Sequence, residues 1–136
     1  MRLGFCCQAA AALRADAEAL ANDRKTLGLL FENLALRELS VYAQASGADV
    51  MHYRDNSALE VDAIVSTRDG KWAGVEIKLG VGQEDAAAKA LTRLANKIEA
   101  GGGSAPQCLV VLVGLGAFAH QRQDGVSVVP IDTLGP

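Results

Sequence analysis

Two carboxylates and a lysine stand close together in the middle of the chain. Asp62 lies in one Val/Ile-rich run, and Glu76 and Lys78 lie in the next, with the turn-forming pair Asp69-Gly70 between the runs. Such a pair between two apolar runs predicts a β-hairpin. Carboxylate oxygens can hold a divalent cation, and a lysine beside them can orient water or neutralise a phosphate. The hairpin therefore carries residue types suited to metal-assisted hydrolysis.

The register of this hairpin decides whether the two acids meet. With a two-residue loop, paired positions sum to 139, and Glu76 shares a face with the apolar residues of the first strand. With a three-residue loop and Gly70 in the left-handed position of a bulge, paired positions sum to 138, and Asp62 lies opposite Glu76. The second register gathers the apolar residues on one face, so the sequence predicts it. That face comprises Val61, Ala63, Val65, Ala73, Val75, Ile77 and Leu79.

Like charges that face each other across two strands are destabilising unless something holds them together. A hard cation such as Mg²⁺ would do so, since it commonly binds one or two carboxylates together with water and phosphate oxygens. The alternative interpretation is an edge hairpin whose charges are solvated. Residue spacing alone leaves both interpretations open.

Glu32 is a further acidic candidate, on a helix predicted over residues 26–45. It falls within an apolar stripe, with Leu29 three residues before it and Leu36 four residues after it. This helix is apolar nearly all round, which predicts that it is buried. A buried carboxylate is costly unless it is paired or bound to metal. The alternative is that Glu32 reaches the helix edge and meets solvent or an arginine.

A second helix is predicted over residues 83–100, with Leu91, Leu94, Ala95 and Ile98 on its inward side. On its other side, basic residues recur every four positions and form a stripe. The stripe consists of Lys89, Arg93 and Lys97. Such a stripe is either a solvated face or a set of phosphate contacts.

Apolar runs place the remaining strands at residues 50–54, 108–113 and 126–129. The predicted order is helix, three strands, helix, strand, strand. Because a strand–helix–strand link within one sheet is almost always a parallel crossover, the sheet should be mixed. The sequence thus predicts an α/β fold with a mixed sheet flanked by helices over residues 24–136. Residues 1–23 are predicted to be a separate helical segment, and a remnant of a longer protein is one interpretation of it.

Composition sets limits on function. The chain has 136 residues, of which 50% are hydrophobic and 21% charged, so one globular domain is expected. The net charge of −3 means that any nucleic-acid binding must come from a local patch. Aromatic residues make up only 4%, which argues against stacking platforms for single strands. The three cysteines form no disulfide framework or zinc pattern, so a reducing cytoplasm is expected, and no apolar run could span a membrane.

Four segments, taken in order, resemble the PD-(D/E)XK nuclease superfamily. They are Gly28-Leu29-Leu30-Phe31-Glu32-Asn33, Tyr53-Arg54, Glu60-Val61-Asp62 and Val75-Glu76-Ile77-Lys78. The resemblance covers roughly residues 24–131 and is closest to the uncharacterised domain found after a P-loop ATPase domain in many prokaryotic ATPases. It implies a restriction-endonuclease-like core of helix, three strands, helix and strand.

The resemblance also implies roles for individual residues. Asp62 and Glu76 match the carboxylates that bind Mg²⁺ or Mn²⁺, and Lys78 matches the catalytic lysine. Glu32 matches the helix acid that completes the site as a further metal ligand. Val61 stands where the namesake motif has proline. The chain has no Gly-Lys-Ser/Thr loop, so a P-loop ATPase is expected only as a partner, in cis or in trans.

Three functional hypotheses follow. The first is a Mg²⁺-dependent DNA phosphodiesterase, in which Arg54 joins the basic stripe in contacting phosphates. The second is a non-catalytic module that binds DNA or a partner for an ATPase; the acidic net charge and few aromatics favour it. The third is an oligomerisation domain whose interface is the helix at residues 26–45. The complete acid–lysine set favours the first, because a module freed from chemistry has no evident reason to keep buried carboxylates together.

Overall fold

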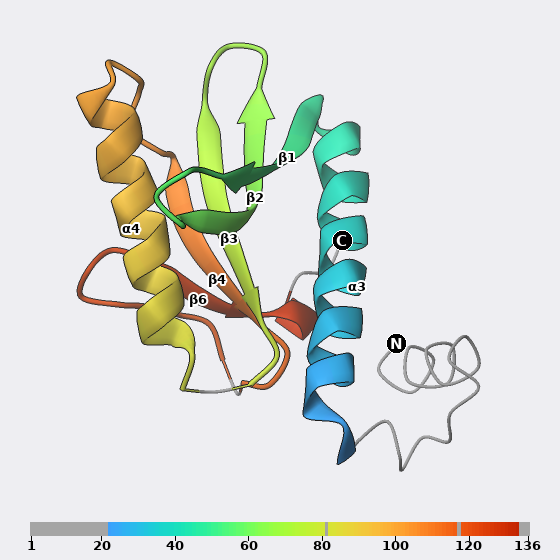
Figure 1. Ribbon diagram of the computed structural model, residues 1–136. Helices are drawn as coiled ribbons and strands as arrows, with labels where there is room; N and C mark the ends of the chain where they lie inside the picture. Colours follow the sequence, from blue (N-terminus) through green and yellow to red (C-terminus); the bar gives the residue numbers. More distant parts are fainter. Residues whose placement is uncertain (1–21, 81, 117, 134–136) are drawn as a thin grey trace.

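The computed structural model describes residues 22–80, 82–116 and 118–133. A six-stranded mixed sheet, in the order β1-β2-β3-β4-β6-β5, lies between helix α3 on one face and helix α4 on the other (Figure 1). The predicted α/β architecture with helices flanking a mixed sheet is therefore confirmed. The helical segment predicted for residues 1–23 lies almost wholly outside the described residues.

The elements follow the predicted order, but the short strand β5 and the 3₁₀ helix η1 were not predicted. The first half comprises α3 (Arg24–Ala45), β1 (Ala48–Arg54), β2 (Glu60–Thr67) and β3 (Trp72–Lys78). The second half comprises α4 (Glu84–Ala100), β4 (Cys108–Val113), β5 (His120–Gln121), β6 (Ser127–Pro130) and the short 3₁₀ helix η1 (Ile131–Thr133). β3, β4 and β6 are parallel neighbours, whereas β1–β2, β2–β3 and β5–β6 are antiparallel.

Helix α3 is only partly buried. Its amino terminus is capped by Asp23, whose carboxylate accepts a hydrogen bond from Thr26 N at 3.1 Å. Phe31 lies against the sheet, where it shares a core cluster with β3 and β4 side chains. Leu29 and Val41 are 56% and 57% exposed. The prediction of a helix buried all round is therefore wrong, because the sheet covers only one side of α3.

The β2–β3 hairpin has the predicted three-residue loop. Ala63 pairs with Val75, and Ser66 pairs with Trp72, so paired positions sum to 138. Thr67 N donates to the Lys71 carbonyl at 2.9 Å, and Gly70 has a φ of 84°. This left-handed conformation is one that glycine adopts without steric cost.

A β-bulge interrupts the pairing of β1 with β2. Asp62 and Ala63 together face His52, so β2 carries one extra residue at this point. The bulge changes the side-chain alternation: Val61 packs with the core cluster under α4, whereas Ala63 packs under α3. The prediction that Val61 and Ala63 share a face is therefore wrong.

Helix α4 covers the other face of the sheet. Leu91 and Leu94 are fully buried, and Ile98 packs against the same cluster, so the predicted inward side is confirmed. Arg122 Nη2 forms an ion pair with Asp85 Oδ1 at 2.8 Å, which ties the β5–β6 turn to the first turn of α4. Over the described parts of the chain, neither this helix nor any other combines the length and apolarity needed to cross a membrane.

Candidate functional site

Asp62 and Glu76 lie side by side where the β2–β3 ladder ends. Beyond the pair Ala63–Val75, side-chain oxygens accept hydrogen bonds from backbone N–H groups that have no partner in the ladder. Asp62 N donates to Glu76 Oε1 at 3.1 Å, and Ile77 N donates to Asp62 Oδ2 at 2.7 Å. Each acid is therefore bonded to the backbone of the other acid's strand. Two reciprocal bonds fix the carboxylates in place.

Lys78 compensates part of the negative charge of this pair. Its Nζ lies 3.1 Å from Glu76 Oε2, and Glu76, at 4% exposure, is the one buried charged residue in the described part of the chain. Burial raises the pKa of Glu76, and the neighbouring Asp62 carboxylate adds to this effect. Burial alone would lower the pKa of Lys78, but the carboxylates of Glu76, Asp62 and Glu32 together raise that pKa above its ordinary value. Lys78 is therefore held as a cation.

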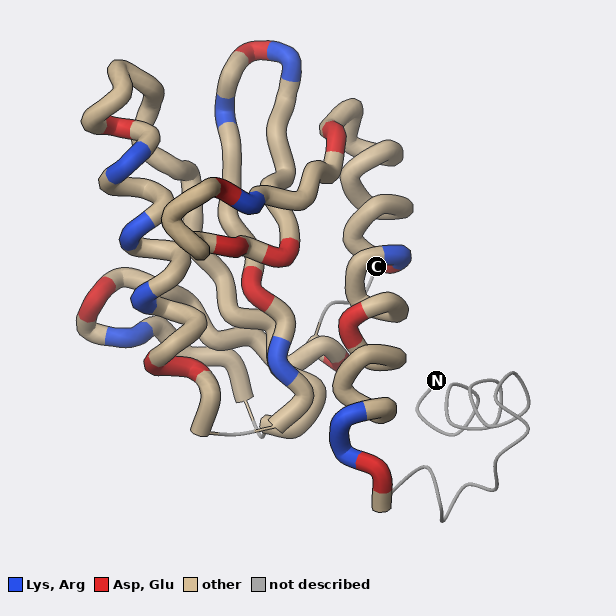
Figure 2. Tube along the Cα trace, in the orientation of Figure 1, with Lys and Arg blue, Asp and Glu red and all other residues tan. Residues whose placement is uncertain are grey.

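Glu32 faces this pair from α3. It is half-buried, and burial raises its pKa, with a second contribution from the Asp62 carboxylate and an opposing one from Lys78. Acidic positions of α3, β2 and β3 lie near one another in Figure 2. The structure therefore brings together all four residues that the sequence proposed for the reaction: Glu32, Asp62, Glu76 and Lys78.

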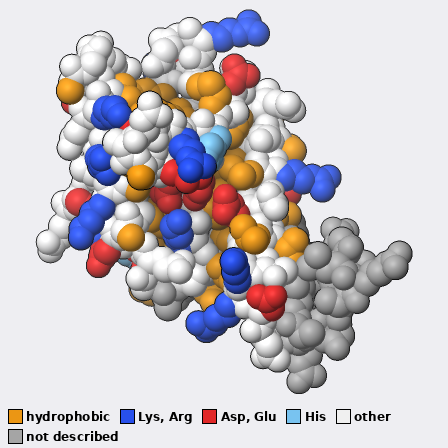
Figure 3. All heavy atoms as spheres, in the orientation of Figure 1, with side chains coloured by type: hydrophobic (Ala, Val, Ile, Leu, Met, Phe, Trp, Pro, Cys, Tyr) orange, Lys and Arg blue, Asp and Glu red, His pale blue; other side chains and the backbone are white. Residues whose placement is uncertain are grey.

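His52 and Glu60 lie at the rim of the site, and sequence reasoning missed both. His52 Nε2 is 3.2 Å from Glu60 Oε1, and His52 Nδ1 is 3.4 Å from the Asp62 carbonyl oxygen. Figure 3 shows acidic side chains gathered near the centre of this face, with lysine and arginine side chains around them. The available signal was the antiparallel β1–β2 pairing, which places residue 52 near residue 62.

Two residues of the basic stripe on α4 form contacts within the protein. Lys97 forms an ion pair with Asp55 in the β1–β2 loop, and Arg93 Nη2 donates to Ser57 Oγ at 3.2 Å. Hydrogen bonds from Lys97 and Ser57 hold the pKa of Asp55 well below its usual range. Two of the predicted DNA contacts, Arg93 and Lys97, therefore hold this loop against α4.

The other two predicted DNA contacts are accessible. Lys89 is exposed on α4 and Arg54 is exposed at the end of β1, opposite Glu60. Neither side chain forms a hydrogen bond or ion pair with a described residue. Lys89 and Arg54 can therefore meet an external anion without first breaking an internal contact.

The acids fit a hard divalent cation held mainly through water. Within the ranges that the structure describes, no group of three or more His, Cys, Asp or Glu side chains is arranged to hold a metal ion. Asp62 Oδ2 and Glu76 Oε1 each already accept a backbone N–H, which leaves Asp62 Oδ1 and the Lys78-bonded Glu76 Oε2 as oxygen donors. Mg²⁺ often takes only one or two carboxylates and keeps several waters. Two carboxylates are enough for this requirement, so the free oxygens of Asp62 and Glu76 are compatible with such a cation.

Comparisons with known proteins add one match. A search of curated proteins and a search of solved structures both found no match. A family model described as "Domain of unknown function (DUF4143)" matches residues 27–134, which include α3 except its first three residues, α4, the six strands of the described sheet and the four gathered residues. The chain therefore belongs to the DUF4143 family.

Proposed function

We propose that this protein is a Mg²⁺- or Mn²⁺-dependent phosphodiesterase that acts on DNA. One observation carries the proposal: Asp62 and Glu76 are locked together at the end of the β2–β3 ladder, with Lys78 bonded to the buried acid. Like charges so close together are costly without a counter-charge, and a single lysine compensates only one of them. A divalent cation would compensate the rest.

The residues would divide the work as follows. Asp62 and Glu76 would hold the cation, which when bound lowers the pKa of water and takes up charge that develops on phosphate. Lys78 would contact a phosphate oxygen or orient the attacking water through its ammonium group. Glu32, whose pKa is raised, would accept a hydrogen bond from water at the same site.

We also propose that the domain is kin to the PD-(D/E)XK nucleases. The support is the order of elements together with the positions of the acids: Glu32 on the first helix, Asp62 at the start of the second strand, and Glu76 and Lys78 on the third. The bulge in β2 is consistent with this assignment, since bulges are over-represented beside active sites, where they re-aim a side chain.

Calorimetric titration with Mn²⁺ tests the metal site directly. The intact protein is compared with Asp62→Asn, which keeps an oxygen to accept the Ile77 N–H but removes the charge. Asp49→Asn on β1 is the matched control, because Asp49 is exposed and has no described partner. Binding by the intact protein and the control, with loss in Asp62→Asn, is the expected result.

A negative titration must hold with DNA present to be decisive. Phosphate oxygens commonly complete a Mg²⁺ site, so the titration is repeated with a short DNA duplex and a short single strand. No Mn²⁺ binding under any of these conditions would refute the phosphodiesterase assignment. Binding that persists in Asp62→Asn would place the metal elsewhere and would also refute it.

A non-catalytic module that binds DNA or a partner protein is the second candidate. Glu76 and Lys78 already form an ion pair, and both carboxylates already satisfy backbone N–H groups, so the site is self-consistent without metal. Domains of this family are commonly found with ATPase domains, so the partner would be a P-loop ATPase in cis or in trans. Mn²⁺ binding that depends on Asp62 favours the first candidate, and its absence favours the second.

A further inference from the structure

Two hollows lie on either side of one ridge of α4. The first, of about 410 Å³, lies between α4 and the β5–β6 turn and is lined by Lys89, Thr92, Arg93, Asn96 and Asp124. The second, of about 300 Å³, lies between α4 and the β1–β2 loop and includes Leu59, Glu60 and Ala90, again with Lys89 and Arg93. Both hollows are shallow and open to solvent. The two hollows share their cations.

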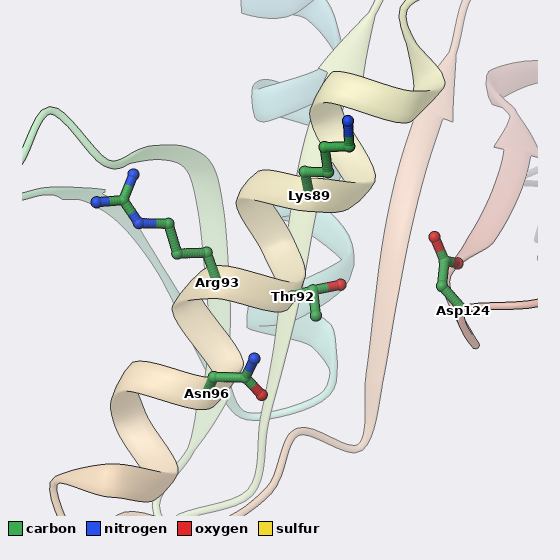
Figure 4. A pocket seen from close by; sticks show the side chains of 5 residues that line it. All are labelled: Lys89, Thr92, Arg93, Asn96 and Asp124. Atoms are coloured by element: carbon green, nitrogen blue, oxygen red, sulfur yellow. The ribbon is translucent and has the colours of Figure 1, made fainter.

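The shared cations stand between the two hollows. Lys89 and Arg93 are one helical turn apart, so their side chains are neighbours on the surface of α4. Lys89 has no partner among the described residues, and Arg93 uses only one nitrogen, Nη2, on Ser57. In Figure 4 the two side chains extend in different directions from the helix, so a phosphate that contacts both requires the Lys89 side chain to turn towards Arg93.

The first hollow offers groups that can read a base edge. Figure 4 shows Thr92 and Asn96 pointing from α4 towards the turn that carries Asp124, whereas Arg93 reaches the opposite way. Asn96 has no hydrogen-bond partner among the described residues, so its amide presents both a donor and an acceptor. Asp124 pairs with Arg122, whose Nε lies 3.2 Å from its Oδ2, and accepts a hydrogen bond from the Val126 N–H at 3.1 Å. Because Arg122 also pairs with Asp85, its single charge offsets only part of the negative charge of the two carboxylates, so a bound strand would place a base rather than a phosphate beside Asp124.

The second hollow leads from the ridge towards the candidate active site. Glu60 lines this hollow and contacts His52, and it lies two residues before Asp62 on β2. A polymer strand that crosses α4 at Lys89 and Arg93 would therefore place one monomer in the first hollow and the next monomer beside the acids.

We infer that this groove binds a single strand of nucleic acid, with one phosphate between Lys89 and Arg93 and a nucleoside in each hollow. The inference rests on the proposed function for its choice of a nucleic acid. A duplex turns its bases inward and could not fill two hollows in the protein, whereas a single strand can turn its bases outward. Since no aromatic residue of the described chain lines either hollow, binding depends on phosphate and base-edge contacts rather than on stacking.

Fluorescence anisotropy with labelled six-nucleotide DNA strands tests the groove. The measurements use EDTA, so they do not depend on the metal site. They compare single strands of adenine, cytosine and thymine with a DNA duplex long enough to stay paired at the assay concentration. Lys89→Ala is compared with Lys25→Ala, which removes the same charge from the first turn of α3, across the sheet from α4. Asn96→Ala tests the base contact.

The expected results are quantitative. Removing one phosphate contact to a single strand reduces the magnitude of the slope of log affinity against log salt by about 0.7, so Lys89→Ala should show this change and Lys25→Ala should not. Asn96→Ala should leave the slope unchanged and weaken the preferred base by about two- to tenfold, the range expected for one neutral hydrogen bond. All intact-protein affinities should favour the single strand over the duplex.

Several outcomes would overturn the inference. It fails if the duplex binds as tightly as the strands, if no strand binds, or if the two lysine variants change the slope equally. The result also separates the two proposals. Strand binding without Mn²⁺ binding refutes the phosphodiesterase and retains the groove, while Mn²⁺ binding without strand binding does the reverse.

Discussion

Replacing Lys78 with methionine should leave a buried carboxylate without its counter-charge. Glu76 is 4% exposed, and its Oε2 has Lys78 Nζ as its partner at 3.1 Å. Methionine has a similar length and no charge, so Lys78→Met preserves much of the packing while removing the ammonium group. Glu76 would then carry its negative charge beside Asp62 with nothing to balance it.

The expected loss follows from the exposure of the two partners. Breaking a fully buried pair costs about 3 to 5 kcal/mol, but Lys78 keeps 32% of its side-chain surface exposed, so water screens part of the interaction. We expect a loss of about 2 kcal/mol in the free energy of unfolding at pH 7.5. This loss is a large fraction of the stability of an ordinary domain.

The loss should depend on pH with a defined sign. Burial and then Asp62 raise the pKa of Glu76 above the ordinary value of 4.5, and losing Lys78 raises it further. A group whose pKa is higher in the folded state stabilises that state at pH values below the unfolded pKa, and this stability is lost as pH rises through the folded pKa. The difference between Lys78→Met and the intact protein should therefore shrink between pH 7.5 and pH 5.

Urea unfolding in EDTA, followed by fluorescence of the single tryptophan, provides the assay, because Trp72 is 7% exposed and lies in the core. The double variant Glu76→Gln/Lys78→Met is the control, since it removes both charges and should recover much of the lost stability. Equal losses for Lys78→Met at both pH values, or no recovery in the double variant, would refute the reasoning.

Three further predictions concern stability and can be measured by urea or thermal unfolding followed by the same tryptophan fluorescence. Gly70→Ala should lower the free energy of unfolding by about 1 to 2 kcal/mol, because φ is 84° at Gly70. Gly28→Ala should instead raise it by about 0.5 to 1 kcal/mol, because Gly28 lies within α3 and has open space around a new Cβ. Losses of equal size in the two variants would contradict this prediction. Asp55→Asn should lower the melting temperature at pH 7. Because the pKa of Asp55 is lower in the folded protein, the difference in melting temperature between the variant and the intact protein should shrink as pH falls below 3.8. A difference that persists at low pH would show that the charge of Asp55 is not the cause. Gly74→Ala should cost about 1 to 3 kcal/mol, because its Cβ would lie 3.0 and 3.1 Å from two core leucine side chains, and an unchanged stability would mean that these side chains move aside.

The hairpin register was predictable because two local rules agree. Asp69-Gly70 restricts the loop, and the period-two alternation of apolar residues then selects one of two registers. The bulge at Asp62 was not predictable by the same rules. It arises from the pairing of β2 with β1, and a hairpin pattern in β2 and β3 contains no information on that third strand.

The sequence was enough to predict which acids of the candidate site lie close together, but not which basic side chains are accessible. Glu32, Asp62, Glu76 and Lys78 are set by the order of elements and by one register, so local patterns suffice to bring them together. Whether a basic side chain on α4 is accessible depends instead on the β1–β2 loop. The stripe spacing gave no sign that Asp55 would engage Lys97, because the two lie 42 positions apart in the sequence.

The reciprocal bonds between the acids and the strands have a consequence for comparing relatives. The side chains of Asp62 and Glu76 accept hydrogen bonds from the last N–H groups of the ladder, as backbone carbonyls do elsewhere in the sheet. A descendant that lost all chemistry would still need an acceptor at both positions, so selection for folding alone would tend to retain oxygen-bearing side chains there. Acids at these two positions in an aligned relative are thus compatible with an inactive relative as well as an active one. Replacement by Asn and Gln, which keep the hydrogen-bond acceptors but remove the charge, would mark a lineage that kept the fold and lost the reaction.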